Sequence, residues 1–488
     1  MVDQNYISKE QMEDALSDDV YDRIQNVNTA AKETSSHYSY FTDELIDQVT
    51  EALMKKLGYT ESQASNLVYS GGLKIYTTQD PKIQAIVDEE VNDTGNYTVA
   101  KYSVEYRLSV NHADGTTQHY SEENLRAYRK NTLGDTAFEG LYNSKEEVQA
   151  DIDQYKAWLL KDGDDVIAER QNLILQPQAS FFIMDQHTGE VKALSGGRGE
   201  KTASRTLNRA TNVYRQPGSS FKVLTAFAPA LDTCGATLGT VYYDAPYTIG
   251  NKTFRNWWGE SRGFTGYSNI REGIIYSMNI IAVRTLMETV TPQLGVEYAE
   301  NMGITSLTKD DLGAALSLGG ITKGVSNMEL TAAYAAIANG GVYTTPRFFT
   351  KILDHDGKVL IDNEPETKQV LKDSTAFLLT DAMSESMKAN RKFARSGVSI
   401  NSTSTRAALT GMSAAGKSGT TTSNNDVWFV GFTPYYTAGV WGGCDNNQKL
   451  KHGNVDNGGT SFHKDIWRNI MNRVHEGLED PGFTVPDA

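Results

Sequence analysis

The stretch Lys417-Ser418-Gly419-Thr420-Thr421 lies just before an aromatic run, Asp426-Val427-Trp428-Phe429-Val430-Gly431-Phe432. A cation, two hydroxyls and a glycine on one extended segment can hold an anionic peptide end, because the glycine lets a substrate backbone lie close to the strand. We therefore expect a carboxylate-binding strand edge in which Lys417, Ser418, Gly419 and Thr420 contact the substrate. For this edge to take part in catalysis on the bound peptide, a nucleophile must lie beside it.

The nucleophile candidate is Ser219, within Arg215-Gln216-Pro217-Gly218-Ser219-Ser220-Phe221-Lys222. Pro-Gly marks a turn, and apolar residues then recur at helical spacing: Phe221, Leu224, Phe227 and Leu231. Ser219 is therefore expected at a helix N-terminus, with Lys222 one turn later on the same face and within reach of the hydroxyl proton. A lysine acts as a base only when neutral. Burial and the like charge of Lys417 would both favour the neutral amine.

A third motif, Ser277-Met278-Asn279, interrupts two apolar helical segments, residues 268–275 and 280–286. A hydroxyl and an amide at such a joint can relay a proton and hold a substrate amide. The order S-x-x-K, S-x-N, K-[S/T]-G is the motif set of serine β-lactamases and penicillin-binding proteins.

Two further S-x-x-K matches, Ser306 to Lys309 and Ser461 to Lys464, show that this motif alone is weak. The first precedes two aspartates and indicates a loop or a helix start. The second opens an amphipathic stretch and predicts a packing helix. Another S-x-N match, Ser423 to Asn425, is typical of a polar turn. Only Lys417 begins a K-[S/T]-G-T sequence, so the ordered set of three motifs carries the assignment.

The chain resembles the class A penicillin-binding proteins over much more than these motifs. The resemblance to their transpeptidase domain extends from about Ala179 to Gly443, through Ser317-Leu318-Gly319-Gly320 and residues 333–341. Residues 71–81 are similar to the linker before that domain, and residues 4–16 to the last helix of the glycosyltransferase domain. We expect a fragment that lacks the rest of that domain and the membrane anchor, so glycan polymerisation is not predicted.

The resemblance implies a peptidoglycan D,D-transpeptidase that is acylated by β-lactams. Ser219 would attack the stem peptide at its D-Ala-D-Ala end, with Lys222 as base and Ser277 passing the proton to the leaving group. Asn279 would steady the substrate amide and Lys222. The Ser418 and Thr420 hydroxyls, with Lys417 nearby, would hold the terminal carboxylate. The backbone N–H groups of Ser219 and Thr420 would form the oxyanion hole. Three alternatives stay open: a D,D-carboxypeptidase, a β-lactamase, and a non-catalytic β-lactam sensor or scaffold.

The predicted fold class is α/β (α+β): a penicillin-binding or serine β-lactamase-like domain with a central antiparallel sheet flanked by helices. Strand patterns at both ends of residues 179–450, around a helical middle, indicate that sheet. We expect a helical remnant and linker over 1–70, a mixed α/β linker region over 71–178, the transpeptidase domain over 179–450, and a C-terminal helix and tail over 451–488. At 488 residues, the length allows about two to four domains.

Within the linker region, residues 96–176 form an extra module, because apolar and polar residues alternate over 101–110 before Asp114-Gly115, a hairpin turn. Two interpretations are open: binding to another cell-wall synthesis protein, and a packing role without chemistry, which is favoured.

Composition limits the partners. The net charge of −15 argues against nucleic acid, since no basic block exists to neutralise phosphates. Cys234 and Cys444 match no metal or redox spacing, and the expected chemistry needs no cofactor or metal. No run of eighteen apolar residues and no signal-peptide pattern occurs. The resemblance places the full-length protein at the extracytoplasmic face of the bacterial membrane, attached only through the missing anchor; as this fragment we expect it to be soluble.

Overall fold

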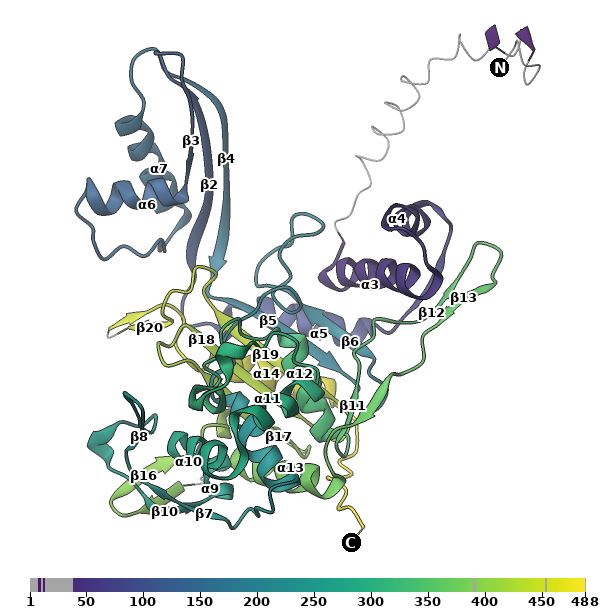
Figure 1. Cartoon of the computed structure of the whole chain (residues 1–488). Helices are drawn as coiled ribbons and strands as arrows, with labels where there is room; N and C mark the ends of the chain where they lie inside the picture. The colour runs from purple at the N-terminus through teal and green to yellow at the C-terminus, as the bar shows by residue number, and fades with distance from the viewer. Residues whose placement is uncertain (1–7, 10–11, 14–37, 389–391, 453, 488) are drawn as a thin grey trace.

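The computed structural model describes residues 8–9, 12–13, 38–388, 392–452 and 454–487. Its centre is a five-stranded antiparallel sheet in the order β17-β18-β19-β5-β6 (Figure 1). The strands are β5 (Gln178–Met184), β6 (Val191–Ser195), β17 (Ala415–Thr420), β18 (Asp426–Phe432) and β19 (Thr437–Gly443). Strands far apart in sequence therefore meet where β19 pairs with β5, which confirms the predicted central antiparallel sheet.

Helices cover both faces of this sheet, so its strands are buried on both sides. On one face lie α5 (Pro81–Asn92) and α14 (Phe462–Val474), whose apolar residues pack with Phe181, Ile183 and Phe429. On the other lies α12 (Asn327–Ala338), which begins at the capping box of Ser326 and Glu329, and α13 (Asp373–Met387) packs against β17. This layering places β17 beside the helical part of the chain.

That helical part runs from the end of β6 to α12 and holds the largest apolar core. Its helical elements are η2 (Gly218–Ser220), η3 (Val223–Phe227), α8 (Ala228–Asp232), η4 (Glu260–Arg262), α9 (Ile270–Ile275), α10 (Asn279–Arg284), η5 (Thr285–Val290), α11 (Pro292–Asn301), η6 (Lys309–Asp311) and η7 (Ala314–Leu318). Small antiparallel pairs border it: β7 (Val241–Asp244) with β10 (Gly266–Asn269), β8 (Tyr247–Ile249) with β9 (Lys252–Phe254), and β15 (Lys392–Arg395) with β16 (Val398–Asn401).

The N-terminal region packs beside the sheet. It contains α3 (Tyr40–Leu57), α4 (Glu61–Ser70) and β1 (Lys74–Thr77); β1 pairs with β12 (Phe349–Leu353), and β12 pairs with β13 (Val359–Asp362). Nearby, β11 (Val342–Thr344) pairs with β14 (Thr367–Gln369). Most of the stretch 4–16 lies outside the described residues. No helix in the described ranges is both long and apolar enough to cross a membrane.

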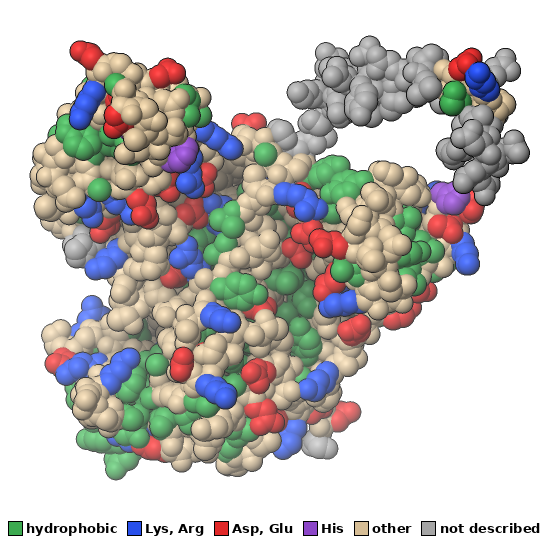
Figure 2. All heavy atoms as spheres, turned by 45° about the horizontal axis from the view of Figure 1, so that its top comes forward, with side chains coloured by type: hydrophobic (Ala, Val, Ile, Leu, Met, Phe, Trp, Pro, Cys, Tyr) green, Lys and Arg blue, Asp and Glu red, His purple; other side chains and the backbone are tan. Residues whose placement is uncertain are grey.

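Residues 101–176 form a module that stands away from the body on a narrow neck (Figures 1 and 2). It consists of β2 (Lys101–Asn111), β3 (Thr117–Ser121), α6 (Glu122–Asn131), α7 (Lys145–Leu159) and β4 (Asp165–Gln176). Its apolar core, around Tyr106, Ile152 and Tyr155, is separate from the others. The expected hairpin is present, and the sheet gains β4, which pairs with β2 along its whole length. The remaining short elements are η1 (Thr94–Asn96), η8 (Thr405–Ala407), β20 (Lys451–His452) and β21 (Val455–Asp456).

Candidate active site

Ser219 lies in the middle of η2, half-buried, directly beside strand β17. Two glycines allow this close approach. A Cβ on Gly419 would lie 2.3 Å from the carbonyl oxygen of Pro217, and one on Gly218, whose φ is +55°, would lie 2.6 Å from that of Thr420. The indole of Trp428 also donates to the Gln216 carbonyl at 2.9 Å. The predicted nucleophile and the predicted carboxylate-binding edge are therefore neighbours in space.

Lys222 is fully buried, and its amine faces the S-x-N motif. Its Nζ donates to the Ser277 carbonyl oxygen at 2.7 Å, to Ser277 Oγ at 3.1 Å and to Asn279 Oδ1 at 2.7 Å. Within the described part of the chain, the Ser219 hydroxyl has no hydrogen-bond partner. The direct Ser219–Lys222 contact expected from the spacing is thus not formed. The carbonyl and hydroxyl oxygens of Ser277 and the amide oxygen of Asn279 surround the amine instead.

Ser277 is the point where the three motifs meet. Lys417 Nζ donates to Ser277 Oγ at 2.9 Å, on the same oxygen that Lys222 contacts, and to the Ser418 carbonyl at 2.8 Å. Ser277 has a φ of +54°, in the left-handed region that a non-glycine residue seldom adopts. Such backbone strain persists only where the surroundings hold it, and it clusters at functional sites.

Burial and like charges lower the pKa of both lysines. The pKa of Lys222 falls well below its ordinary 10.5, because burial penalises the ammonium and Lys417 adds like-charge repulsion. This is the combination expected from the sequence. Burial, together with the charge of Lys464, lowers the pKa of Lys417 to about 7. The site therefore gives Lys222 a larger neutral fraction than an ordinary lysine has at the same pH.

The carboxylate-binding edge gains one residue that the sequence did not indicate. Ser418 Oγ donates to Thr403 Oγ1 at 2.8 Å, while Thr420 lies exposed at the end of β17. Thr403 lies in a loop fourteen residues before Lys417 and carries no motif, so only the tertiary fold brings its hydroxyl to the strand.

The nucleophile turn also rests on residues beyond the motifs. Tyr334 on α12 donates from its hydroxyl to the Ser220 carbonyl at 2.6 Å. Arg215 pairs through its backbone with Val325 in both directions. Gly319 lies so close that a Cβ there would be 2.3 Å from the Gly218 carbonyl oxygen. The Ser317–Gly320 stretch, noticed only as a family resemblance, thus backs the turn that carries Ser219.

The other motif matches have the structural roles expected of them. Ser306 donates to the Gly324 carbonyl, and Lys309 begins the short turn η6. Ser461 is the N-cap of α14, the predicted packing helix. No motif indicated that Lys464 on this helix lowers the pKa of Lys417 through its charge. Asn424, in the third match, has a φ of +59° in the turn between β17 and β18.

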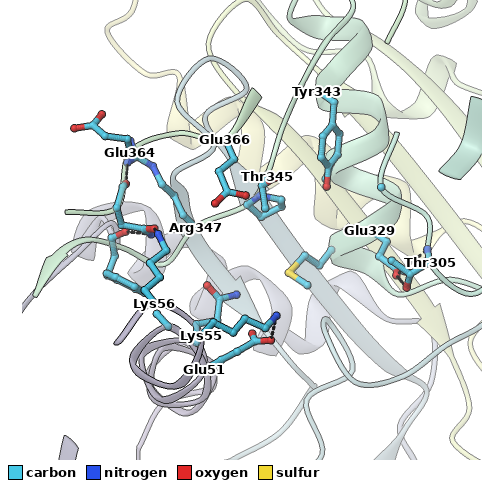
Figure 3. A pocket seen from close by; sticks show the side chains of 18 residues that line it. Glu51, Lys55, Lys56, Thr305, Glu329, Tyr343, Thr345, Arg347, Glu364 and Glu366 are labelled. Carbon is cyan, nitrogen blue, oxygen red and sulfur yellow. Dashed lines mark hydrogen bonds and ion pairs between the residues drawn. The ribbon is translucent and has the colours of Figure 1, made fainter. Parts of the chain in front are cut away.

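A separate cavity of about 350 Å³ lies between α3 and the start of α12 (Figure 3). Met328 and Ala332 contribute apolar surface, and the Lys55–Glu51 ion pair lies at its border (Figure 3). None of the motif residues lines it. It is therefore distinct from the candidate active site.

The chain is similar to known proteins over most of its length. A family model, the penicillin binding protein transpeptidase domain, matches residues 179–472. Penicillin-binding protein 1A of Clostridium botulinum (strain Langeland / NCTC 10281 / Type F) is 30% identical over 487 residues, covering 98% of this chain and 48% of that protein. The chain thus spans about half the length of such curated relatives.

Solved structures agree on the fold. Penicillin-Binding Protein 1A from Haemophilus influenzae has a TM-score of 0.63 at 20% identity, covering 100% of this chain and 76% of that one. The PonA1 protein from Mycobacterium tuberculosis in complex with penicillin V has a TM-score of 0.61 at 22% identity, covering 92% and 96%. The resemblance and the fold class predicted from the sequence are confirmed. The chain belongs to the penicillin-binding protein transpeptidase family.

Proposed function

We propose that this chain is a peptidoglycan D,D-transpeptidase that works through a serine acyl-enzyme and is acylated by β-lactams. One observation carries the proposal: Lys222 and Lys417 both contact the Ser277 hydroxyl, and Asn279 contacts the Lys222 amine, beside the turn that holds Ser219. Nucleophile, base, relay and cation are the groups that acyl transfer to an amine requires.

In the first step, Ser219 Oγ attacks the carbonyl carbon of the penultimate D-Ala and its proton passes to neutral Lys222. The tetrahedral oxyanion accepts hydrogen bonds from the N–H groups of Ser219 and Thr420, usually the largest single contribution to such catalysis. When the C–N bond breaks, the proton passes from Lys222 through the Ser277 hydroxyl to the nitrogen of the terminal D-Ala. This step leaves an ester on Ser219 and a free amino acid.

In the second step, the amine of a neighbouring stem peptide attacks the ester carbonyl. The amine proton returns through the same groups to Ser219, and a new peptide bond cross-links the two stems. Lys222 must act as proton acceptor in both steps, and its lowered pKa supports that role. Because Lys222 does not contact the Ser219 hydroxyl directly, we propose that substrate binding, or a rotation of that hydroxyl, completes the contact.

The terminal carboxylate of the donor peptide would bind at the edge of β17. Lys417 supplies the charge, the Thr420 hydroxyl donates a hydrogen bond, and the Ser418 hydroxyl donates one after it turns from Thr403 to the substrate. The Thr403 hydroxyl, paired with Ser418, adds a fourth group to this set. Asn279 Nδ2 donates to the Arg255 carbonyl and its Oδ1 accepts from Lys222, so its amide holds the amine while it contacts the substrate.

A product assay tests the activity. The protein is incubated with a donor peptide ending in D-Ala-D-Ala and an amine acceptor, and D-Ala release is compared with cross-linked dimer. Dimer formation that depends on the acceptor supports transpeptidation. Release without dimer would instead identify a carboxypeptidase, and rapid turnover of nitrocefin a β-lactamase. Stable acylation without any product from the peptide would identify a sensor or scaffold.

We also propose that the protein acts at the extracytoplasmic face of the membrane, where stem peptides are cross-linked. The family membership supports this location.

A further inference from the structure

The helix that carries Asn279 begins without a cap of its own. Helix α10 starts at Asn279, and its N-cap residue, Met278, has no side chain able to accept a hydrogen bond from the first N–H groups. Unpaired N–H groups at a buried helix start are unfavourable, so an acceptor must come from elsewhere.

That acceptor is Asn256, a buried residue in the connection after β9. Its Oδ1 accepts from the backbone N–H of Asn279 at 2.9 Å and from that of Ile280 at 3.2 Å. Asn256 therefore caps α10 from twenty-three residues away and fixes the position at which the S-x-N motif enters the helix.

The two neighbours of Asn256 bind the same loop. The Arg255 carbonyl accepts from Asn279 Nδ2 at 2.9 Å. The Trp257 indole donates to the Tyr276 carbonyl at 2.9 Å. Three consecutive residues, the 255–257 segment, thus hold the residues on both sides of Ser277.

Asn256 is itself held in one orientation by a buried carboxylate. Its Nδ2 donates to Asp244 Oδ1 at 2.7 Å, and Asp244 Oδ2 accepts from the N–H and the hydroxyl of Thr265, both at 2.8 Å. With its NH₂ group committed to Asp244, the amide presents its oxygen to α10. The chain of contacts therefore runs from Asp244 through Asn256 to Asn279 and, from Asn279 Oδ1, to Lys222 at 2.7 Å.

We infer that Asn256 is a positioning residue of the reaction: through α10 it sets where Ser277 and Asn279 lie, and with them the amine of Lys222. It touches none of the reacting atoms. The inference rests on the proposed function, since it predicts the rate at which Ser219 is acylated. Small displacements of catalytic groups lower rates strongly, because the reactive geometry tolerates little error.

The experiment measures the second-order rate constant of acylation by a fluorescent penicillin and, by intact mass, the final labelled fraction. Asn256→Asp should lower the rate constant by about tenfold to a hundredfold. The new carboxylate at position 256 would face Asp244, and like charges raise the pKa of one of the two groups, so the rate constant is measured across pH. The loss should grow as the pH rises and the pair loses its shared proton, because repulsion then pulls the acceptor away from α10. Asn251→Asp, the same change at an exposed turn of the neighbouring hairpin, should leave the rate constant unchanged.

The structure also provides a rescue. In the double variant Asp244→Asn/Asn256→Asp, the new amide at position 244 can donate to the carboxylate at 256 while its oxygen accepts from Thr265. The hydrogen bond between positions 244 and 256 is then restored in the reverse direction, and the bonds from Thr265 and from the N–H groups of α10 are kept. The double variant should be acylated with a rate constant within about threefold of the wild-type value. The reason is that the two substitutions act on one hydrogen-bond network and compensate for each other.

The labelled fraction separates positioning from folding. A purely structural defect reduces the fraction of chains that become labelled, whereas a positioning defect slows labelling and leaves the final fraction at the wild-type level. If Asn256→Asp does not fold, Asn256→Ser replaces it. The serine side chain introduces no buried charge, but it is too short to contact both Asp244 and α10. This variant should also be labelled slowly and completely.

Two results would overturn the inference: acylation of the single variant as fast as the wild type, or a double variant no faster than the single one. A wild-type protein that no penicillin acylates would overturn the proposed function, and this inference with it.

Discussion

Lys417 Nζ lies 2.9 Å from Ser277 Oγ, so a cation from the central sheet meets a hydroxyl from the helical part of the chain. The candidate site is therefore built across a packing interface, and its geometry depends on how closely the two parts approach. This relationship makes the chemistry testable through both the charged groups and the glycines that allow the approach.

Replacing the proposed base should nearly stop acylation. Lys222→Ala should lower the acylation rate constant by at least about a hundredfold, the lower range of general-base contributions. In the wild type the rate should rise with pH, because only the neutral amine accepts a proton and the pKa of Lys222 is well below 10.5. Stopped-flow labelling across pH measures both effects. Lys309→Ala, in one of the rejected motif matches, is the control. A flat profile from about pH 6 to 10, together with a Lys222→Ala variant that is still acylated at the wild-type rate, would remove Lys222 from this role.

Esterifying the carboxylate of the β-lactam should slow acylation of the wild type. The expected loss is about 2 kcal/mol in the activation barrier, the scale of hydrogen bonds to charged groups. A Ser418→Ala/Thr420→Val variant should be slow with the free acid and lose little more with the ester. Equal rates for acid and ester in the wild type would show that β17 is not a carboxylate site.

The same acid-to-ester ratio should depend on pH. Burial and Lys464 lower the pKa of Lys417 to about 7, so the free protein loses this charge as the pH rises through that value. The preference for the acid should therefore shrink above about pH 7, whereas effects of Lys222 cancel in the ratio. A preference that stays constant to high pH would contradict a role for the Lys417 charge.

The close approach of the two parts predicts a strict requirement for glycine at position 419. In Gly419→Ala the new Cβ would lie 2.3 Å from the Pro217 carbonyl oxygen, so β17 and the nucleophile turn must move apart. We expect a loss of stability of about 1–3 kcal/mol, typical of overpacking, together with lost labelling. Gly313→Ala is the matched control, since nothing lies within 4 Å of its Cβ position. Thermal unfolding and penicillin labelling measure the outcome; normal labelling of Gly419→Ala would contradict the described approach.

We propose that residues 101–176 are a separable domain, because their apolar core is their own. Lys101 and Gln176 are paired neighbours in the sheet, so a short glycine linker can replace the residues between them. The shortened chain should be acylated within about twofold of the wild-type rate, because independent sites have nearly additive effects. Labelling kinetics measure this, and a large loss of rate would instead tie the module to the active site. Gln176, which donates to Asp445 at 2.8 Å, is retained in this design.

The local chemistry of the site could be predicted from the sequence because each motif carries its own signal. Pro217-Gly218 marks the turn before Ser219, and the small residues around Lys417 mark a strand edge. Contacts made by residues that belong to no sequence motif could not be predicted. Asn256 and Thr403 reach the site from loops without a motif, and Lys464 acts on Lys417 only because α14 packs against the sheet.

In the fold, too, elements with a clear sequence pattern could be predicted and those without one could not. Strand patterns at both ends of the domain predicted the antiparallel sheet. Strand β4 was missed, since most of its residues are exposed and it lacks the clear alternation of β2. The Ser219–Lys222 spacing placed both residues on one helical turn, and the resemblance implied the contact of Asn279 with Lys222, but neither revealed that Ser277 also holds the amine.

The central claim is that Ser219 is the nucleophile of this site. Intact-mass spectrometry after exposure to benzylpenicillin tests it most directly, in the wild type and in a Ser219→Ala variant with an unchanged unfolding temperature. The account predicts one stable penicilloyl adduct on the wild type, located on the peptide that contains Ser219, and none on the variant. An adduct that persists in Ser219→Ala, or that maps to Ser306 or Ser461, would contradict it.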